Sequence, residues 1–209
     1  MTARDYWPVP RLWSGETVFV IGGGPSLRGF DFDRLRDRNS IAVNAALIDA
    51  PDASVSLTSA HAFFERHRAA FDAFGGIALT MSKAAQVAAP DRLRLIEAIE
   101  TQRDGFNVRP GAVRRGLTTG HTAAALAIAL GASRVVLLGV DGRAGTGGSH
   151  YHGHYAYVPP TTPERLAAYV AGWSGWRAQA RAVGVDIVNA TPGSAVAEFP
   201  IVDIDDEMA

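Results

Sequence analysis

The chain has 209 residues, a formal net charge of −1 at pH 7 and no cysteine. This length suits one ordinary domain with a substantial core, so we expect residues 1–209 to form a single domain. The balanced charge excludes the broad basic surface of a general nucleic-acid-binding protein. The missing thiols exclude disulfides and cysteine nucleophiles. No signal-peptide pattern and no apolar stretch long enough to span a bilayer is present, so we expect a cytoplasmic protein without a membrane partner.

The most informative segment is an apolar run that stops at three glycines. The run 18–21 is β-branched and apolar, which is typical of a strand buried on both faces. Proline after such glycines suits the first turn of a helix. A glycine turn at a helix start offers unpaired amides and the positive end of the helix dipole to a phosphate. We therefore predict an anion site at Gly22, Gly23, Gly24 and Ser26.

The common phosphate-binding motifs do not fit this turn. The dinucleotide motif needs a third glycine where Leu27 stands, and an acidic residue after the next strand, where Asn44 stands. The chain has no Gly-Lys-Ser/Thr, which excludes a Walker loop. We predict that the amide of Asn44 contacts a ribose, a base or a phosphate. The alternative for the whole segment is a tight turn without a ligand.

Short apolar runs alternate with amphipathic segments along the chain, the pattern of a doubly wound α/β sheet. We predict one Rossmann-like, mainly parallel sheet with helices on both faces. Helices are predicted over 60–74, 118–130 and 162–184, and the region 82–115 stays open between helix and strand. The predicted strands are 17–22, 40–44, 53–58, 76–81, 134–139 and 185–190.

Other turns at the predicted carboxyl edge of the sheet also carry polar residues. Asp141 follows a buried strand there, so it would hold a metal, a ribose or an acceptor hydroxyl, or else cap the turn. Thr119 and Gly120 open a helix, which predicts a second anion site, although N-capping alone accounts for a threonine. Asn189 lies near the end of the last predicted strand and Ser194 lies in the turn after it, where contact with a base or sugar and an ordinary turn remain equally open.

The region 142–162 is long and has no periodicity, which is uncommon in a compact domain without a functional reason. It contains His150, His152 and His154, which an extended segment would place on one side. These histidines are predicted to supply a general base near neutral pH. A metal site with Asp141 and a plain polar loop are the alternatives.

The order of these motifs resembles a known superfamily. Gly22–Leu27 with Asn44 resembles the Gly-x-Gly-Pro-Ser-Leu…Asn signature of Campylobacter-type bacterial sialyltransferases and of MptE-like 6-hydroxymethylpterin diphosphokinases. Thr119–Gly120 with Leu138–Asp141 is similar to the Ser-Gly…Gly-Ile-Asp stretch of the sialyltransferases. Ser194 with Phe199–Pro200 resembles their last turn, whereas Pro51–Ser56 looks more like the diphosphokinases. Uncharacterised phage and prophage proteins share the pattern, including its histidine-rich segment.

The resemblance implies a nucleotide-binding fold. It implies that Gly22, Gly24, Ser26 and Asn44 contact the nucleotide, that Thr119 and Gly120 lie near phosphate, and that one of the three histidines is the general base. Gly23 stands where the sialyltransferases have asparagine, a departure that bears on which base is bound. Tyr151, Tyr155 and Tyr157 are the candidates for the tyrosines that serve the leaving phosphate.

We therefore hypothesise a nucleotide-dependent transferase that moves a glycosyl group from a nucleotide-sugar donor to an acceptor hydroxyl. An MptE-like diphosphokinase that transfers pyrophosphate from ATP is the first alternative; it would need Mg²⁺, with Asp141 as its carboxylate. A non-catalytic, phage-associated nucleotide-binding module is the second. The expected partners are a small-molecule donor and acceptor, and a homo-oligomer is left open.

Overall fold

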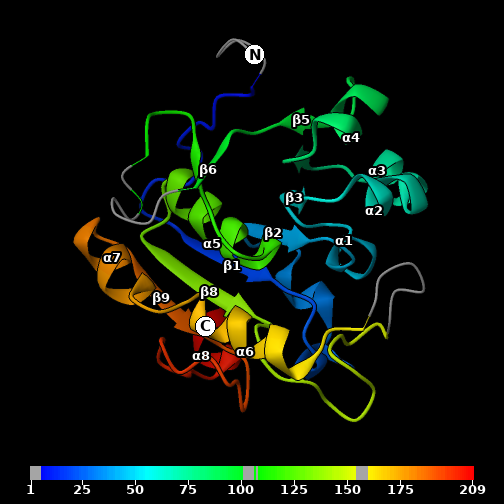
Figure 1. Ribbon diagram of the computed structural model, residues 1–209. Helices are drawn as coiled ribbons and strands as arrows, with labels where there is room; N and C mark the ends of the chain where they lie inside the picture. Colours follow the sequence, from blue (N-terminus) through cyan, green and yellow to red (C-terminus); the bar gives the residue numbers. More distant parts are fainter. Residues whose placement is uncertain (1–5, 101–105, 107, 154–159) are drawn as a thin grey trace.

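The computed structural model describes residues 6–100, 106, 108–153 and 160–209. Its centre is a seven-stranded sheet with the order β5-β4-β3-β2-β1-β8-β9, in which every neighbouring pair is parallel (Figure 1). A separate parallel pair, β6 and β7, lies beside it. The strands are β1 (Thr17–Ile21), β2 (Ser40–Val43), β3 (Val55–Thr58), β4 (Ile77–Thr80), β5 (Arg94–Leu95), β6 (Ala98–Glu100), β7 (Val113–Arg115), β8 (Arg134–Leu138) and β9 (Asp186–Asn189).

All six predicted strands are confirmed, and most of their residues are buried between the helices on the two faces of the sheet. β2, for example, is buried at all four positions, as parallel strands covered on both sides must be. The region 82–115, left open from the sequence, supplies the short edge strand β5 and the pair β6–β7 in addition to one helix. Short strands of two or three residues carry too little periodicity to be recognised.

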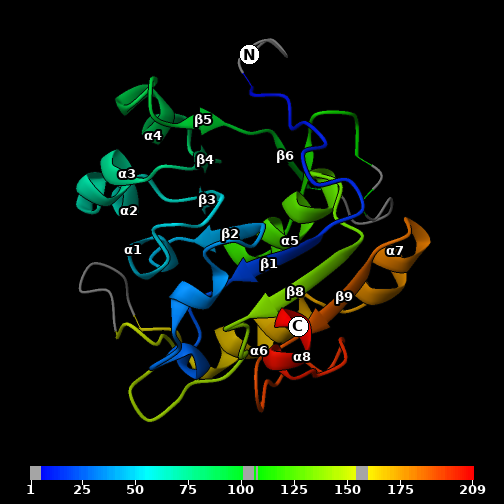
Figure 2. The ribbon, with the colours of Figure 1, turned by 180° about the vertical axis from the view of Figure 1, so that it is seen from behind.

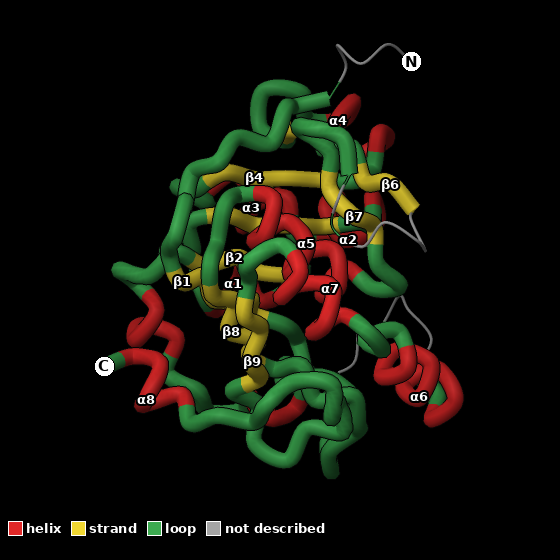
Figure 3. Tube along the Cα trace, turned by 90° about the vertical axis from the view of Figure 1, so that its left-hand side faces the viewer, coloured by secondary structure: helices red, strands yellow, loops and turns green. Residues whose placement is uncertain are grey.

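Helices cover both faces of the sheet, which confirms the doubly wound, Rossmann-like prediction. The helices are α1 (Ala46–Asp49), α2 (His61–Arg66), α3 (Arg68–Ala73), α4 (Lys83–Ala88), α5 (Thr119–Ala129), α6 (Pro163–Ala171), α7 (Trp176–Ala182) and α8 (Ile204–Met208). One apolar core joins the sheet to α5, to Trp173 and to Trp176, the first residue of α7. A second core on the other face contains side chains of α1 to α4. Helix α5 lies in front of the strands in Figure 1 and behind them in Figure 2, which is the view from the other side. Figure 3 shows α6 and α8 on opposite sides of the sheet.

The alanine-rich helix α5 forms as predicted. Thr118 caps it by accepting a hydrogen bond from the His121 amide, and the helix gives way to Gly131, whose φ is +103°. Its alanines are buried against the sheet, because their small side chains let the helix backbone approach the strands closely.

Three predicted helices differ from the structure. The glycine turn leads into a single 3-10 turn, η2 (Pro25–Leu27), because the chain becomes extended at Arg28, with ψ 118°. The predicted helix 162–184 is two helices, α6 and α7, because Gly175 takes the left-handed conformation at φ +76°. The predicted helix 60–74 bends at His67 into α2 and α3, which brings the rings of Phe64 and Phe71 within 5.3 Å.

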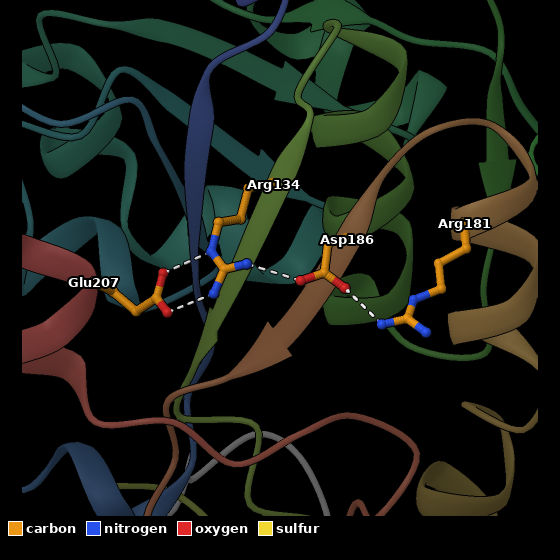
Figure 4. Close-up of polar contacts among 4 residues, drawn as sticks. All are labelled: Arg134, Arg181, Asp186 and Glu207. Atoms are coloured by element: carbon orange, nitrogen blue, oxygen red, sulfur yellow. Dashed lines mark hydrogen bonds and ion pairs between the residues drawn. The ribbon is translucent and has the colours of Figure 1, made fainter.

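Charged side chains fasten α8 to the amino-terminal ends of two strands (Figure 4). Arg134 on β8 donates two hydrogen bonds to Glu207 at 2.8 and 2.6 Å, and a third to Asp186 on β9 at 2.8 Å. Asp186 also pairs with Arg181 on α7 at 3.6 Å. This network therefore ties the last helix to the sheet. Within the described ranges, no helix combines the length and apolar character needed to cross a membrane.

Candidate functional site

A cavity of about 550 Å³ opens at the carboxyl edge of the sheet. From β1 the strands β2 to β5 are added in succession on one side of the sheet, whereas β8 and β9 are added on the other side of β1. The strand order therefore reverses between β1 and β8. Ligands of open α/β sheets bind at such a switch point. The turns after β1 and β8, the residues after β2 and β3, the start of α5 and one face of α6 all line the cavity.

The glycine turn lines the cavity, but most of its amides are used by the protein. Gly22 donates to the Leu138 carbonyl at 2.7 Å and Gly24 donates to the Gly139 carbonyl at 2.8 Å. The Ser26 amide donates to Asp141 at 3.0 Å. Of the amides at these positions, that of Gly23 alone has no partner within the described part of the chain. Because no α-helix follows the turn, the predicted helix-dipole contribution to anion binding at this place is wrong.

Close packing requires glycine at two positions of the turn. A Cβ on Gly22 would lie 2.6 Å from the Gly139 carbonyl oxygen, and one on Gly24 would lie 1.9 Å from a carboxylate oxygen of Asp141. The turn after β1 therefore sits directly against the turn after β8. The glycines shape the cavity wall by allowing this approach.

Asp141 is 3% exposed and holds that junction together. Its two oxygens accept from the Ser26 amide at 3.0 Å and from the Ser26 hydroxyl at 2.8 Å. Burial raises the pKa of Asp141, and the Ser26 hydrogen bonds and the charge of Arg143 oppose that shift. Ser26 therefore donates hydrogen bonds to Asp141 from both its hydroxyl and its amide. This differs from the prediction that Ser26 donates a hydrogen bond to an anion in the cavity.

The start of α5 forms another part of the cavity wall. The Thr119 hydroxyl lies 2.8 Å from that of Ser59, which follows β3. The amides of Thr119 and Gly120 belong to the first turn of this eleven-residue helix, where backbone N–H groups have no carbonyl partner within the helix. Both residues line the cavity. The predicted anion site at Thr119 and Gly120 therefore has amides unpaired within the helix and a helix dipole, which the predicted site at the glycine turn largely lacks.

Asn44 stands at the end of β2 with φ +50°, a backbone conformation that asparagine tolerates better than most residues. It lines the cavity, and its side-chain oxygen Oδ1 is buried without a hydrogen-bond partner among the described residues. An unsatisfied buried carbonyl of this kind is uncommon in folded proteins and fits a group reserved for a ligand.

His150 is the described histidine of the 150–154 segment that lines the cavity. The Ser149 hydroxyl lies 3.0 Å from its Nδ1. His152 stacks on it, with 5.2 Å between ring centroids. Burial lowers the pKa of His152, and the charge of Asp49 opposes that shift. The segment is a turn rather than extended, since the Gly153 amide donates to the His150 carbonyl at 3.3 Å. His154, Tyr155 and Tyr157 lie outside the described residues.

Other predicted residues are not brought to the cavity. The side-chain amide of Asn189 is fully buried. Its nitrogen donates to the Val140 carbonyl, and its oxygen accepts from the Thr191 backbone N–H. The Ser194 hydroxyl donates to the Val140 carbonyl at 2.6 Å. Both side chains therefore stabilise the turn that carries Asp141. Ser26 and His152 are likewise absent from the described cavity lining.

The cavity also contains residues that the sequence did not single out. Ser59 follows a strand at the same edge as Asn44, so the rule applied to Asn44 would have found it. Arg143 lies two residues beyond Asp141 and donates to the Gly193 carbonyl at 2.6 Å. Arg165 and Tyr169 face the cavity from α6; their contribution depends on the path of the preceding loop, which has no sequence signal.

The charged groups of the lining favour an anionic guest. They are Arg143, Arg165 and Asp141 in the described residues, and Asp141 is already hydrogen-bonded by Ser26. No cluster of three acidic, histidine or cysteine side chains suited to a metal occurs in 6–100, 106, 108–153 and 160–209.

No protein-family model and no curated protein matches the sequence. Solved structures do match it. The MAf glycosyltransferase from Magnetospirillum magneticum AMB-1 aligns with a TM-score of 0.64 at 15% identity, over 96% of this chain and 36% of that chain. The sialyltransferase CstII from Campylobacter jejuni with cytidine-5′-monophosphate aligns with a TM-score of 0.54 at 17% identity, over 89% of this chain and 84% of that chain. The same enzyme with CMP-3FNeuAc gives 0.51 at 16% identity, with the same coverage.

This protein therefore has the α/β fold of those glycosyltransferases. It spans about a third of the Magnetospirillum protein and most of the Campylobacter enzyme. At identities of 15–17% the likeness establishes the fold, and activity has to be argued from the site.

Proposed function

We propose that the chain is a nucleotide-dependent glycosyltransferase that moves a sugar from a nucleotide-sugar donor to an acceptor hydroxyl. The observation that carries the proposal is the cavity at the switch point between β1 and β8. Two arginines, the start of α5 and an Asn44 oxygen without a partner among the described residues line it. These groups suit a phosphate and a sugar or base. Structural neighbours that bind CMP or a CMP-sugar support the choice of donor class.

In this proposal the nucleotide phosphate lies at the amides of Thr119 and Gly120, with Arg143 and Arg165 balancing its charge. A histidine of the 150–154 segment takes the proton from the acceptor hydroxyl. The acceptor oxygen then forms a bond to the anomeric carbon while the bond from that carbon to the phosphate oxygen breaks, and the nucleotide leaves with the electron pair. General-base catalysis of this kind contributes about 10²–10⁴-fold.

Diphosphate transfer from ATP is the competing chemistry, and it requires Mg²⁺ to neutralise the phosphates. The carboxylate proposed to hold that ion was Asp141. Asp141 is the only carboxylate among the described lining residues, it is 3% exposed, and each of its oxygens already accepts a hydrogen bond from Ser26. The residues present therefore fit a metal ion poorly at this position, and we favour glycosyl transfer. The non-catalytic nucleotide-binding module is distinguished from both by the absence of turnover.

The test is a thermal-shift screen against CMP, CDP, UDP, ATP and GTP, each with Mg²⁺ and with EDTA, followed by turnover of the matching nucleotide sugars. A ligand specific for the native state raises its melting temperature. We expect binding of one nucleotide, and turnover that persists in EDTA. The triple variant His150→Gln/His152→Gln/His154→Gln should lose turnover and keep nucleotide binding, whereas His61→Gln should keep both. A wild type that binds no nucleotide would refute the proposal, and turnover of ATP only with Mg²⁺ would favour the diphosphokinase.

A further inference from the structure

The segment 149–153 has two faces, and its inner face lies on the glycine turn. A Cβ placed on Gly23 would lie 3.1 Å from Cδ2 of His150 and 3.8 Å from Nε2 of His152. The two imidazoles stack on each other with 29° between their planes. The rings therefore rest together on the backbone of Gly23, and His150 is the one that lines the cavity.

The outer face of this segment is Tyr151, which points away from the cavity. Its amide donates to the Gly23 carbonyl at 3.0 Å, and its hydroxyl donates to a carboxylate oxygen of Asp49 at 2.7 Å. Its ring packs against Phe32, with 5.6 Å between centroids. Tyr151 thus occupies a separate groove beside Leu27 and Phe30. Its hydroxyl faces Asp49 there, which does not fit the role at a leaving phosphate that the resemblance implied.

We propose that Tyr151 and Asp49 are a positioning pair that holds the imidazoles of His150 and His152 on the glycine turn, with His150 facing the cavity. This inference rests on the proposed function, because it assigns the pair to the geometry of the general base. Neither residue touches the cavity, so neither is a catalytic residue itself.

The contacts explain why this pair can fix the rings. Tyr151 stands between the two histidines in the chain, and it is held at three points: its backbone, its ring and its hydroxyl. A tyrosine has only two main side-chain torsions, so anchoring the hydroxyl also fixes the backbone on either side of it. Asp49 ends α1, a helix packed against β2. The acceptor of the hydrogen bond is therefore held by the sheet that carries the site.

The expected effect concerns geometry more than stability. A hydrogen bond from a hydroxyl to a carboxylate stabilises one arrangement about tenfold or more over arrangements that lack it. Tyr151→Phe removes this bond and keeps the ring on Phe32. We expect the ratio of positioned to displaced histidine states to fall about tenfold, and turnover to fall by up to that factor, because turnover follows the fraction of molecules in the positioned state.

The first measurement follows the histidine rings without any assay of activity. Two-dimensional ¹H–¹³C spectra of the imidazoles, assigned with single His→Gln variants, report the ring-current displacement that stacking produces. In the wild type the His150 and His152 signals should be displaced. Tyr151→Phe and Asp49→Ala should both remove the displacement, and Asp49→Asn, which keeps an oxygen acceptor, should retain much of it. Tyr6→Phe is the matched control and should change nothing.

The second measurement is turnover of the nucleotide sugar that the wild type uses, together with affinity for its free nucleotide. Tyr151→Phe and Asp49→Ala should each lower kcat by up to about tenfold and leave nucleotide affinity unchanged. The double variant should be no worse than either single variant, because both remove the same contact. A merely structural role would lower the melting temperature and leave kcat unchanged in the folded protein.

Other results of these two measurements would contradict the positioning role of Tyr151 and Asp49. Unchanged histidine signals in Tyr151→Phe overturn the proposal, and so do displaced histidines with unchanged kcat. Additive losses in the double variant show that the two residues do not act through their hydrogen bond. If the wild type binds no nucleotide and shows no turnover, the proposed function fails; loss of the ring displacement then identifies Tyr151–Asp49 as a structural clamp only.

Discussion

At the scale of single residues, several side chains at the site are paired with each other or packed in the core. Asp141 and Ser26, which are 115 positions apart, satisfy each other. His121 packs directly against two glycines. A Cβ on Gly116 would lie 2.1 Å from the His121 Cβ, and a Cβ on Gly172 would lie 2.9 Å from the His121 Nε2. The imidazole stacks on Trp173, with 3.8 Å between centroids. Such pairings depend on distant segments, so no local pattern predicts them.

His121 should make stability depend on pH. Burial, and then the charge of Arg114, lowers the pKa of His121 from 6.5 to about 4. Between these values the unfolded chain binds a proton that the folded chain does not, so the stabilisation is complete above pH 6.5 and is lost as pH falls towards 4. The loss should reach about 3 kcal/mol. Urea denaturation between pH 4.5 and 7.5 measures it.

The control variants for this prediction separate His121 from the other titrating groups. His121→Gln should lower stability near neutral pH, where the packing of the imidazole is lost, and flatten the pH dependence by that amount. His61→Gln, at a side chain 43% exposed, should leave the dependence unchanged. An equally steep loss in His121→Gln below pH 6.5 would show that another group titrates there.

At the scale of elements, the sequence predicts what is decided locally and misses what is decided by one dihedral angle or by a distant contact. The run 18–21 is identified as a strand because burial on both faces demands consecutive apolar residues. α5 is identified because Thr118 caps it and Gly131 ends it. The sequence does not predict the break between α6 and α7, because a glycine inside a helical pattern does not reveal its own φ. Gly175 adopts a φ of +76°, which ends the helical path.

The attachment of α8 is an element-scale feature that mutation can test. Glu207 is 10% exposed at its side chain and receives two hydrogen bonds from Arg134, whose pKa is raised chiefly by that contact. Glu207→Gln removes the charge and one acceptor oxygen, so we expect a loss of about 1–2 kcal/mol in the free energy of unfolding. Denaturant titration measures the loss, and added salt should weaken the wild-type pair only slightly because it is partly buried.

The neighbouring acidic residue of the same helix provides the control. Asp206 is exposed, and Asp206→Asn should change stability by less than about 0.5 kcal/mol. Hydrogen exchange of the α8 amides should accelerate in Glu207→Gln and stay unchanged in Asp206→Asn. Equal effects of the two substitutions would mean that the net charge of α8, rather than the Arg134 contact, holds the helix in place.

At the scale of the whole molecule, the order of the strands decides which polar residues become a site. Three polar residues come shortly after parallel strands: Asn44, Ser59 and Ser82. From the sequence alone, each is an equally good candidate for contact with a ligand. Only the first two line the cavity, since β2 and β3 lie nearer the switch point than β4 does. The sequence predicted the sheet and most of the turns that meet there. It could not predict the reversal between β1 and β8, and therefore could not rank these turns.

This ranking leads to a prediction about nucleotide binding. Asn44→Gly keeps the positive φ that Asn44 adopts and removes a buried oxygen that has no described partner, so the fold should be nearly as stable as the wild type. Loss of one hydrogen bond to the ligand should weaken nucleotide affinity about tenfold. Ser82→Gly removes the side-chain cap of α4 and should lower stability by a few tenths of a kcal/mol without changing affinity. Isothermal titration with the nucleotide selected by the thermal-shift screen compares the two variants. Equal weakening by both, or none by Asn44→Gly, would mean that the ligand lies elsewhere than at the reversal of strand order.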